Sequence, residues 1–520
     1  PACGSLQLFW DLLASAGDGV TLVPSERFDN DLTAVSLLFK RRRDPLSETY
    51  SRHGAFLSKH TFYFDPDFFG IDYTESHTID PQQRLLLHTA AESLLDSGVS
   101  LDLVSGSSTS VFIGICNNDW DVVLRERIAE LILAGYNQAA ILKTVGTVAY
   151  STYAFASNRI SHVLGTLGCS ISIDTASSSS LVATHLSLME SRSFTSLQAL
   201  AGGVNLILHS HLSELHTARS MFPIDGRCKT FDASADGFER SEAVCTVCHH
   251  IGGTTETEKC LANICGSASL HKGGGASLRA LRGPAIQAKV RAAMLDADLK
   301  PTDIRYIEAS GLGEPYGDAV EIGAYQSIFA NGRCATMPIL FGSVHTNIGH
   351  SDGCSGLASL IKAVGITNCQ AAPALVHFTM LHPLVTGRME GGRTARSMGH
   401  TWQNVSVTGF SASWQKLLAP FAANIKAAKA VTGVSSFGFG GSMAHVILSS
   451  TRKASCSSSQ GQSVWYCGKE RIVTSDSEDV NSSKVCSQQV VDNTLSFIAQ
   501  AIEQIIFPLN QLPPPRGINY

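Results

Sequence analysis

The chain has 520 residues, of which 44% are hydrophobic and 16% are charged. That is enough to bury a substantial core, as one large or two fused globular domains. The formal net charge of −5 gives no basic footprint for nucleic acid. The longest mildly apolar segment, residues 131–150, is interrupted by Asn137 and Lys143, so we expect no membrane span.

Strands and helices alternate along most of the chain. Apolar residues at helical spacing predict helices, and short continuous apolar runs are typical of strands buried in a parallel sheet. This alternation predicts an α/β fold. The predicted helices cover residues 79–98 and 287–298, and the predicted strands cover residues 111–115, 199–208 and 304–309.

Residues 172–190 place a serine cluster between a short apolar strand and a helix. Ser178 or Ser179 can cap the amides at the start of that helix. The side chain of Ser177 would then lie beside the positive end of the helix dipole, where a developing anion is stabilised. The segment is therefore either a nucleophile elbow that presents Ser177 or an ordinary capped helix start.

The sequence Asp-Thr-Ala-Ser-Ser-Ser-Ser-Leu-Val-Ala-Thr-His at residues 174–185 resembles the active-site signature of β-ketoacyl synthase (ketosynthase) domains of polyketide and fatty acid synthases. Residues 64–87 and 225–240 are similar to other segments of that family. The resemblance implies an α/β thiolase-like fold, in which two duplicated α/β halves stack in alternating layers. It also implies a first strand that would precede Pro1, so we expect further residues upstream.

The resemblance divides the chain into three parts. We expect an N-terminal ketosynthase-like half at residues 1–265 and a C-terminal half at residues 266–448. Residues 449–520 form an extension with a Ser-rich linker and a Pro-rich tail. Between these, a helix with an apolar stripe either docks on its own domain or binds a partner; its stripe consists of Leu495, Ile498, Ile502, Ile505 and Ile506.

A ketosynthase joins an acyl chain on its cysteine to a malonyl unit, releasing carbon dioxide, and needs an activated nucleophile, an oxyanion hole and two imidazoles. Here Ser177 stands in place of the cysteine. The loop at residues 308–314 carries Ser310 instead of the first histidine. Residues 343–350 keep the second histidine, His350, but have His345 where the family has lysine.

The closing loop of the family also appears in altered form. Residues 438–443 read Gly-Phe-Gly-Gly-Ser-Met, so Met443 replaces the family's asparagine. The glycines and Phe439 keep the pattern of the loop. The resemblance therefore still implies an oxyanion hole made by the amides of Ser177 and Phe439.

These departures predict a catalytically degenerate ketosynthase-like protein. A serine hydroxyl needs an adjacent base, and losing one acid–base group costs about 10²- to 10⁴-fold in rate. We expect a structural, scaffolding or carrier-protein-binding role, with an acyltransferase or thioesterase using Ser177 and His350, or His345 if it reaches the site, as the alternative. An active β-ketoacyl synthase has the least support, and His350 could instead be a hydrogen-bonded core histidine.

Other inferences concern surroundings and ligands. The resemblance implies a homodimer or membership of a larger assembly, with an acyl carrier protein as a candidate partner. The 14 scattered cysteines favour reduced thiols inside a cell.

We expect no cofactor and no metal. The segment from Cys245 to His249 fits a haem-attachment pattern, but residues three apart in a strand point to opposite faces, and residues 311–317 are misspaced for a dinucleotide loop.

Overall fold

The computed structural model divides the chain into two units, residues 1–468 and 469–520, and all described residues belong to the first. The predicted C-terminal helix and Pro-rich tail lie outside the described residues. The structure describes residues 5–25, 27, 52–58, 62–135, 152–193, 196, 198–250, 260–330, 339–385, 405–407, 419–420 and 430–451.

The first sheet has the strand order β4-β3-β5-β6. The strand β3 (Ser110–Gly114) lies between β4 (Ser170–Ile173) and β5 (Gln198–Asn205) and is parallel to both. The strand β6 (Ala243–His250) is antiparallel to β5. All five residues of β3 are buried, as its continuous apolar run predicts for a strand covered on both faces.

The second sheet repeats this pattern. Its central strand β8 is parallel to β9 and β13, and β14 is antiparallel to β13. The full order is β11-β9-β8-β13-β14-β7. The bounds of its strands are β7 Asn263–His271, β8 Tyr306–Glu308, β9 Ile339–Gly342, β11 Val405–Val407, β13 Val431–Phe437 and β14 Ser442–Ser449.

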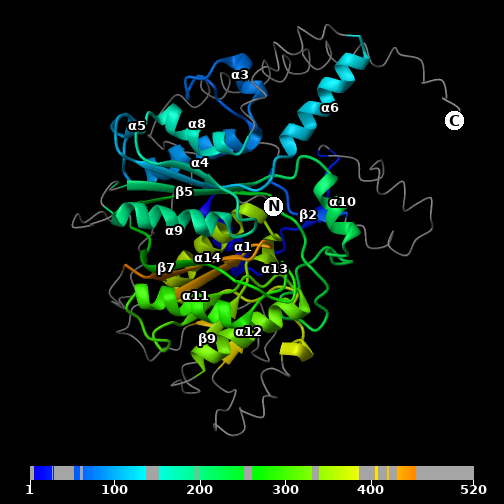
Figure 1. Cartoon of the computed structure of the whole chain (residues 1–520), viewed down its shortest axis with the longest axis vertical. Coiled ribbons are helices and arrows are strands. Elements are labelled where there is room, and N and C mark those ends of the chain that lie inside the picture. Colours follow the sequence, from blue (N-terminus) through cyan, green and yellow to red (C-terminus); the bar gives the residue numbers. More distant parts are fainter. Residues whose placement is uncertain are drawn as a thin grey trace, which may run out of the picture. The chain divides into compact units, whose positions relative to one another are not determined.

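Helices separate and cover the two sheets in five layers (Figure 1). The first sheet is covered on its outer face by α4 (Pro81–Asp96) and α8 (Ala154–Leu164). The helices α9 (Ser179–Arg192) and α14 (Ser355–Cys369) contact both sheets and fill the middle layer. Outside the second sheet lie α11 (Gly283–Asp296) and α12 (Pro315–Phe329). The predicted alternating layers are confirmed.

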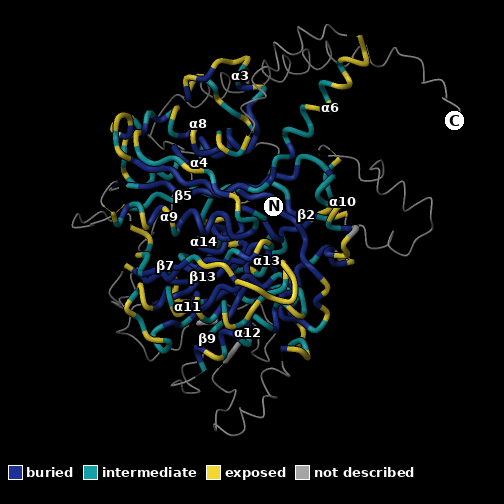
Figure 2. The backbone as a smooth tube through the Cα atoms, in the orientation of Figure 1, coloured by how far each residue is buried: buried dark blue, intermediate teal, exposed yellow. Residues whose placement is uncertain are grey.

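The middle layer is largely buried, as Figure 2 shows for the region around α14. Leu181 of α9 and Leu360 of α14 pack with Phe112 and Val446 from the two sheets. Gly356 lets the two helices approach closely, because a β-carbon there would overlap Leu181. Each such fully buried side chain contributes about 1.5–3 kcal/mol to stability.

Shorter elements complete the described fold. Within the described ranges, no helix combines the length and the apolar character that crossing a bilayer requires. The remaining helices are α1 Leu6–Ala14, α3 Tyr73–Thr78, α5 Leu101–Val104, α6 Asp119–Leu133, α10 His211–Ala218 and α13 His345–Ile348, with a 3₁₀ turn at Asp352–Cys354. The remaining strands pair as β1 Thr21–Leu22 with β2 His53–Gly54, and β10 Ala371–Ala372 with β12 Ala419–Pro420.

Candidate active site

Ser177 lies in the sharp turn between β4 and α9. The turn is made possible by Ala176, whose φ of 55° is in the left-handed region that few residues other than glycine adopt. Ser177 is 2% exposed, and its carbonyl accepts a hydrogen bond of 2.7 Å from the hydroxyl of Ser436 in β13. The two sheets therefore hold this turn from both sides.

The prediction that Ser178 or Ser179 caps α9 is wrong. Neither hydroxyl accepts a hydrogen bond from the first amides of the helix. Ser178 Oγ instead donates to the carbonyl of Thr175 at 2.9 Å, and Ser179 Oγ donates to the carbonyl of Ala176 at 2.6 Å. The two serines therefore stabilise the turn by hydrogen bonds within it, because the left-handed conformation of Ala176 brings those carbonyls within reach.

His350 meets Ser177 across the site. Its Nε2 is 2.9 Å from Ser177 Oγ. The backbone of His350 is held on both sides, since its amide donates to Glu239 at 2.7 Å and its carbonyl accepts from Ser241 at 2.9 Å. The Phe238 ring packs on the imidazole in a T-shaped arrangement, with 5.1 Å between ring centroids. The structure thus places a serine hydroxyl and an imidazole at hydrogen-bonding distance.

His345 lies behind His350 and does not reach Ser177 in this arrangement. Its Nε2 is 3.2 Å from His350 Nδ1, and its Nδ1 is 2.7 Å from the carbonyl oxygen of Ser310. The hydroxyl of Ser355 is a second neighbour of His350 Nδ1, at 3.1 Å. Ser310, which stands where the family has histidine, therefore contributes its backbone oxygen to the cluster.

Both imidazoles are neutral at pH 7. Burial lowers the pKa of His350 to about 4, with a smaller lowering from Arg240, while Asp352 opposes the shift. Burial also lowers the pKa of His345 well below its usual range, and the neighbouring His350 adds to this effect. A neutral imidazole carries one lone pair and one N–H, so each ring can act as an acceptor and a donor at once.

An ion pair between Asp352 and Arg240 lies beside the cluster, and the sequence motifs did not predict it. Asp352 Oδ2 is 3.2 Å from Arg240 Nε, and Asp352 Oδ1 is 3.9 Å from His350 Nε2. Burial acts to raise the pKa of Asp352, but Arg240 and the nearby imidazoles outweigh it and lower the pKa. Asp352 follows His350 by only two positions, so the sequence alone could have indicated an acidic side chain near this histidine.

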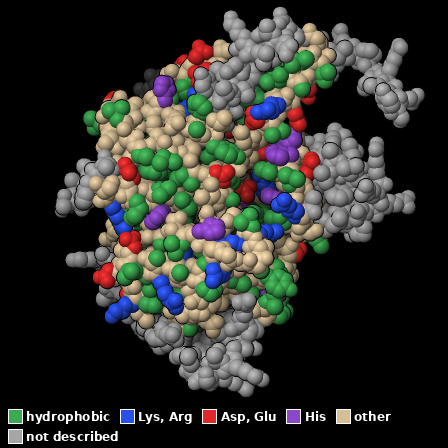
Figure 3. All heavy atoms as spheres, in the orientation of Figure 1, with side chains coloured by type: hydrophobic (Ala, Val, Ile, Leu, Met, Phe, Trp, Pro, Cys, Tyr) green, Lys and Arg blue, Asp and Glu red, His purple; other side chains and the backbone are tan. Residues whose placement is uncertain are grey.

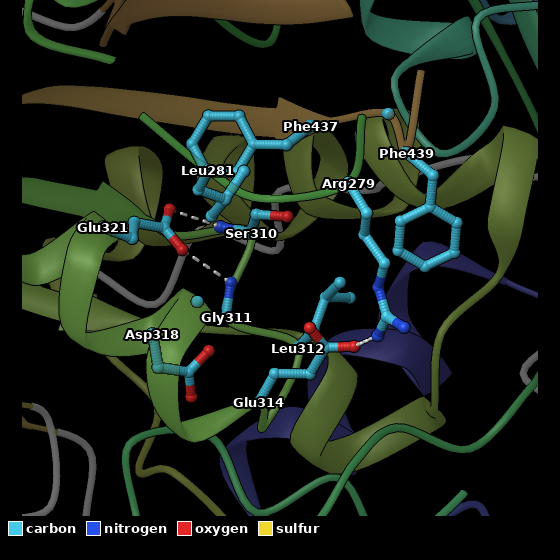
Figure 4. Close-up of a pocket in the computed structure, with 12 residues that line it drawn as sticks. Arg279, Leu281, Ser310, Gly311, Leu312, Glu314, Asp318, Glu321, Phe437 and Phe439 are labelled. Atoms are coloured by element: carbon cyan, nitrogen blue, oxygen red, sulfur yellow. Dashed lines mark hydrogen bonds and ion pairs between the residues drawn. The ribbon is translucent and has the colours of Figure 1, made fainter. Parts of the chain in front are cut away.

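The loop that carries Ser310 keeps its backbone supports. The carboxylate of Glu321 accepts hydrogen bonds of 2.9 Å from the amides of Ser310 and Gly311 (Figure 4). Lys362 pairs with Glu308 at 3.0 Å, at the end of the strand that leads into the loop. The loop is thus held in place although its side chain at position 310 is a hydroxyl.

A small pocket adjoins this loop. Its cavity volume of about 30 Å³ has room for only a few water molecules. Arg279 crosses it, with its guanidinium 5.0 Å from the ring centroid of Phe439 and paired with Glu314 (Figure 4). Ser177 and His350 are not among the residues that line it. The pocket therefore lies next to the candidate site but does not expose its serine.

The closing loop packs directly on the turn of Ser177. Gly438 is required there, because a β-carbon at this position would overlap the carbonyl oxygen of Thr175. Gly441 turns the chain with a φ of 95°, and its amide donates to the Gly438 carbonyl at 2.9 Å. Met443 is buried in a hydrophobic cluster that includes Ile307 and Phe437. The oxyanion hole of Ser177 and Phe439 stays a prediction.

The described residues contain no group of three or more His, Cys, Asp and Glu side chains that could hold a metal ion. Cys245 and Cys248 lie three positions apart in β6, as the argument against the haem pattern expects. On the face drawn in Figure 3, basic and acidic side chains are interspersed.

Comparison with known proteins covers most of the chain. Residues 1–248 match the N-terminal domain of β-ketoacyl synthases, and residues 261–379 match their C-terminal domain. A phenolphthiocerol/phthiocerol polyketide synthase protein of Mycobacterium tuberculosis is 34% identical over 443 residues, 85% of this chain and 18% of that protein. Another protein of the same synthase, from Mycobacterium bovis, is 30% identical over 462 residues, 88% of this chain and 22% of that protein.

Solved structures show the same likeness. The oxazolomycin ketosynthase domain of Streptomyces albus superposes with a TM-score of 0.71 at 28% identity, covering 86% of this chain and 72% of that one. A cysteine-to-serine variant of the ketosynthase from module 6 of the Bacillus subtilis bacillaene synthase gives a TM-score of 0.70 at 25% identity, covering 86% and 69%. The chain spans about a fifth of the length of the curated relatives it matches.

Proposed function

Because the chain belongs to the β-ketoacyl synthase family, we propose that it is a ketosynthase-like domain that has lost decarboxylative condensation and retains a binding or scaffolding role. The relatives are polyketide synthase proteins several times longer than this chain. A carrier protein, a partner domain or a second copy of the chain is the proposed binding partner. An intracellular location stays part of this proposal.

The observation that carries the proposal is the hydroxyl at Ser310. Decarboxylation of a malonyl thioester leaves an enolate, whose charge needs a donor at the thioester oxygen. The loop at residues 308–314 brings no imidazole to that position. The cluster's second imidazole, His345, lies behind His350 and bonds the Ser310 carbonyl, so it cannot take over this role.

The serine at the nucleophile position also supports the proposed loss of condensation. A thiol of lowered pKa supplies a thiolate, whereas a serine hydroxyl must be deprotonated by a base during attack. The base beside Ser177 is His350, whose Nε2 lies 2.9 Å from Ser177 Oγ. Condensation thus lacks its usual nucleophile and one of its two imidazoles.

The preserved backbone frame supports a retained binding role. Buried charges around the site are paired, as for Arg240 with Asp352 and Lys362 with Glu308. A buried charge without its partner would cost about 3–5 kcal/mol, so such a frame persists only where both partners are kept. The site therefore keeps its shape without the groups that perform condensation.

The test is a condensation assay with the full chain. The chain is incubated with an acyl thioester and a malonyl thioester on a carrier protein, and carbon dioxide and β-ketoacyl product are measured beside a competent ketosynthase. We expect neither product above the protein-free background, together with saturable binding of the carrier protein. Catalytic release of carbon dioxide that requires the folded chain would refute the proposed loss of condensation.

A further inference from the structure

Three side chains and one carbonyl form a continuous hydrogen-bonded line at the site. Ser177 Oγ is 2.9 Å from His350 Nε2, His350 Nδ1 is 3.2 Å from His345 Nε2, and His345 Nδ1 is 2.7 Å from the Ser310 carbonyl. Exposed fractions along the line are 3% or less. No ring nitrogen in the line faces bulk water, so the partners decide where each proton sits.

The carbonyl of Ser310 fixes the tautomers of both rings. A carbonyl oxygen only accepts, so His345 Nδ1 carries its proton and His345 Nε2 carries the lone pair. His350 Nδ1 then donates its proton to His345 Nε2, because two facing lone pairs would repel. The remaining lone pair of neutral His350 lies on Nε2, where it accepts the hydroxyl proton of Ser177.

We propose that Ser177, His350 and His345 form a serine–histidine–histidine relay that hydrolyses acyl thioesters. The inference rests on the proposed loss of condensation, which leaves water as the acceptor of the acyl group. Ser177 is the nucleophile, His350 the general base and His345 a positioning residue. Nucleophile, base and orienting group are the parts that acyl transfer requires.

In the first step Ser177 is acylated. The proton of Ser177 Oγ moves to His350 Nε2 while Oγ bonds to the thioester carbonyl carbon. The carbon–sulfur bond then breaks, and the proton on His350 passes to the leaving sulfur. The products are an oxygen ester on Ser177 and a free thiol. Asp352, whose Oδ1 is 3.9 Å from His350 Nε2, stabilises the imidazolium that forms in between.

In the second step water releases the acyl group. His350 Nε2 accepts a proton from water while the water oxygen bonds to the ester carbon. The bond from that carbon to Ser177 Oγ breaks, and His350 returns the proton to Oγ. A carboxylic acid leaves and the site is restored. The absence of an imidazole at Ser310 favours this outcome, because no carbanion is generated to compete with water.

The residue at position 345 distinguishes this relay from the family arrangement. Lysine, which the resemblance places there, has only donor hydrogens. An ammonium facing His350 Nδ1 would force that nitrogen to accept and would move the ring proton to Nε2, toward Ser177. Neutral histidine and glutamine, in contrast, each have a donor group and an acceptor atom, so either can donate to the Ser310 carbonyl and still accept from His350.

The test uses the full chain and the acetyl thioester of N-acetylcysteamine, a substrate with a short acyl group. Thiol release gives kcat and KM, and intact mass with peptide mapping locates the acetyl group. We expect turnover, with transient acetylation of Ser177. Both Ser177→Ala and His350→Ala should lower kcat by at least about 100-fold.

Variants of His345 test the positioning role. We expect His345→Lys to lower kcat about 10³- to 10⁴-fold with little change in KM, as when an orienting group is lost and the wrong tautomer results. We expect His345→Gln to stay within about tenfold of the parent rate, because a conservative donor–acceptor side chain rescues the alignment. The matched control is His162→Gln, which removes an exposed imidazole on α8 and should leave kcat unchanged.

A spectroscopic measurement separates alignment from mere structural damage. In protein with ¹⁵N-labelled histidine, His350 should carry its proton on Nδ1 in the parent and in His345→Gln, and on Nε2 in His345→Lys. Equal kcat values for His345→Lys and the parent would overturn the relay. So would a parent protein that releases no thiol.

Failure of the relay and failure of the proposed function give different results. Without malonyl thioester present, acetyl thioester reports hydrolysis alone. No thiol release overturns the relay but leaves the proposed loss of condensation intact. Carbon dioxide release from malonyl thioester overturns the proposed loss of condensation, and the hydrolysis rate with acetyl thioester is then judged separately.

Discussion

Two walls of the site differ in what they keep of the ketosynthase pattern. The retained wall comprises residues 174–179, 239–241, 349–352 and 438–441, and keeps the pattern except that Ser177 replaces the cysteine. The changed wall comprises residues 308–314. In the retained wall, main-chain hydrogen bonds and a buried ion pair position Ser177 and His350. The changed wall is held as firmly by Glu321, yet its side chain at 310 is a hydroxyl. Groups that hold the backbone are thus separable from groups that do chemistry.

The largest expected effect is the loss of stability when the ion pair of the retained wall is removed. Replacing Arg240 by leucine leaves the largely buried Asp352 carboxylate without its partner, which should lower the free energy of unfolding by about 3–5 kcal/mol. Urea denaturation followed by circular dichroism measures the change. Arg192→Leu is the control, because that arginine pairs with Asp296 near the surface and should cost under about 1 kcal/mol. Equal losses would show that the retained wall does not depend on its ion pair.

The next largest effect is expected when the family's cysteine and histidine are restored at positions 177 and 310. We expect the double variant Ser177→Cys, Ser310→His to release carbon dioxide from a malonyl thioester about 100-fold faster than the parent, since it regains a thiol and an imidazole. The control, Ser177→Cys with Ser310→Ala, should show no such gain. A folded double variant without the gain would place the defect elsewhere, with His345 and Met443 as the remaining differences.

A smaller effect tests how closely the closing loop packs on the turn. Gly438→Ala should lower the free energy of unfolding by about 1–3 kcal/mol, because its methyl group meets the Thr175 carbonyl. Gly440→Ala is the matched control in the same loop, where a β-carbon has no neighbour within 4 Å. Thermal unfolding compares the two variants. If both lower the midpoint equally, loss of loop flexibility rather than the overlap is the cause.

The smallest effect is the response of hydrolysis to pH. The reactive form of His350 is the neutral one, and its pKa of about 4 keeps the ring neutral throughout pH 6–8. We expect kcat for the acetyl thioester to change less than about twofold over that range and to fall only as the pH approaches 4. A histidine of ordinary pKa would give about a fourfold rise between pH 6 and 8, and such a rise would contradict the buried, neutral base.

The lowered pKa of His350 also makes the free energy of unfolding depend on pH. Burial lowers the folded-state pKa of His350 below its unfolded value of 6.5. The contribution of neutral His350 to the free energy of unfolding is therefore fully present above pH 6.5 and is lost as the pH falls toward 4.

The sequence predicted the elements and the layers better than the details of the site. The strand at residues 111–115 and the helix at residues 287–298 appear as β3 (Ser110–Gly114) and α11 (Gly283–Asp296), because continuous or periodic apolar runs report local burial. The meeting of Ser177 and His350 followed from the resemblance, since the two residues are 173 positions apart. No local pattern carries that information.

Other features depended on geometry that a one-dimensional pattern does not encode. Ser178 and Ser179 fit the composition of a helix cap, but the left-handed Ala176 turns nearby carbonyls toward their hydroxyls. The pairing of Arg240 with Asp352 joins residues 112 positions apart. The position of His345 behind His350 depends on the short helix α13 and on Gly349, whose φ is 75°.

The distribution of the site along the chain also sets when it can form. Ser177 is joined to Ser436 across 259 positions, and Gly438 closes the loop over the turn. The loop-closure entropy of such distant contacts must be overcome before they contribute to stability, so we expect them to form late in folding. During synthesis the N-terminal half emerges first and can build its sheet while Ser177 still lacks its base. If Ser177 and His350 form the proposed relay, we expect no hydrolysis of acyl thioesters by the nascent chain until nearly all of residues 1–451 have been made.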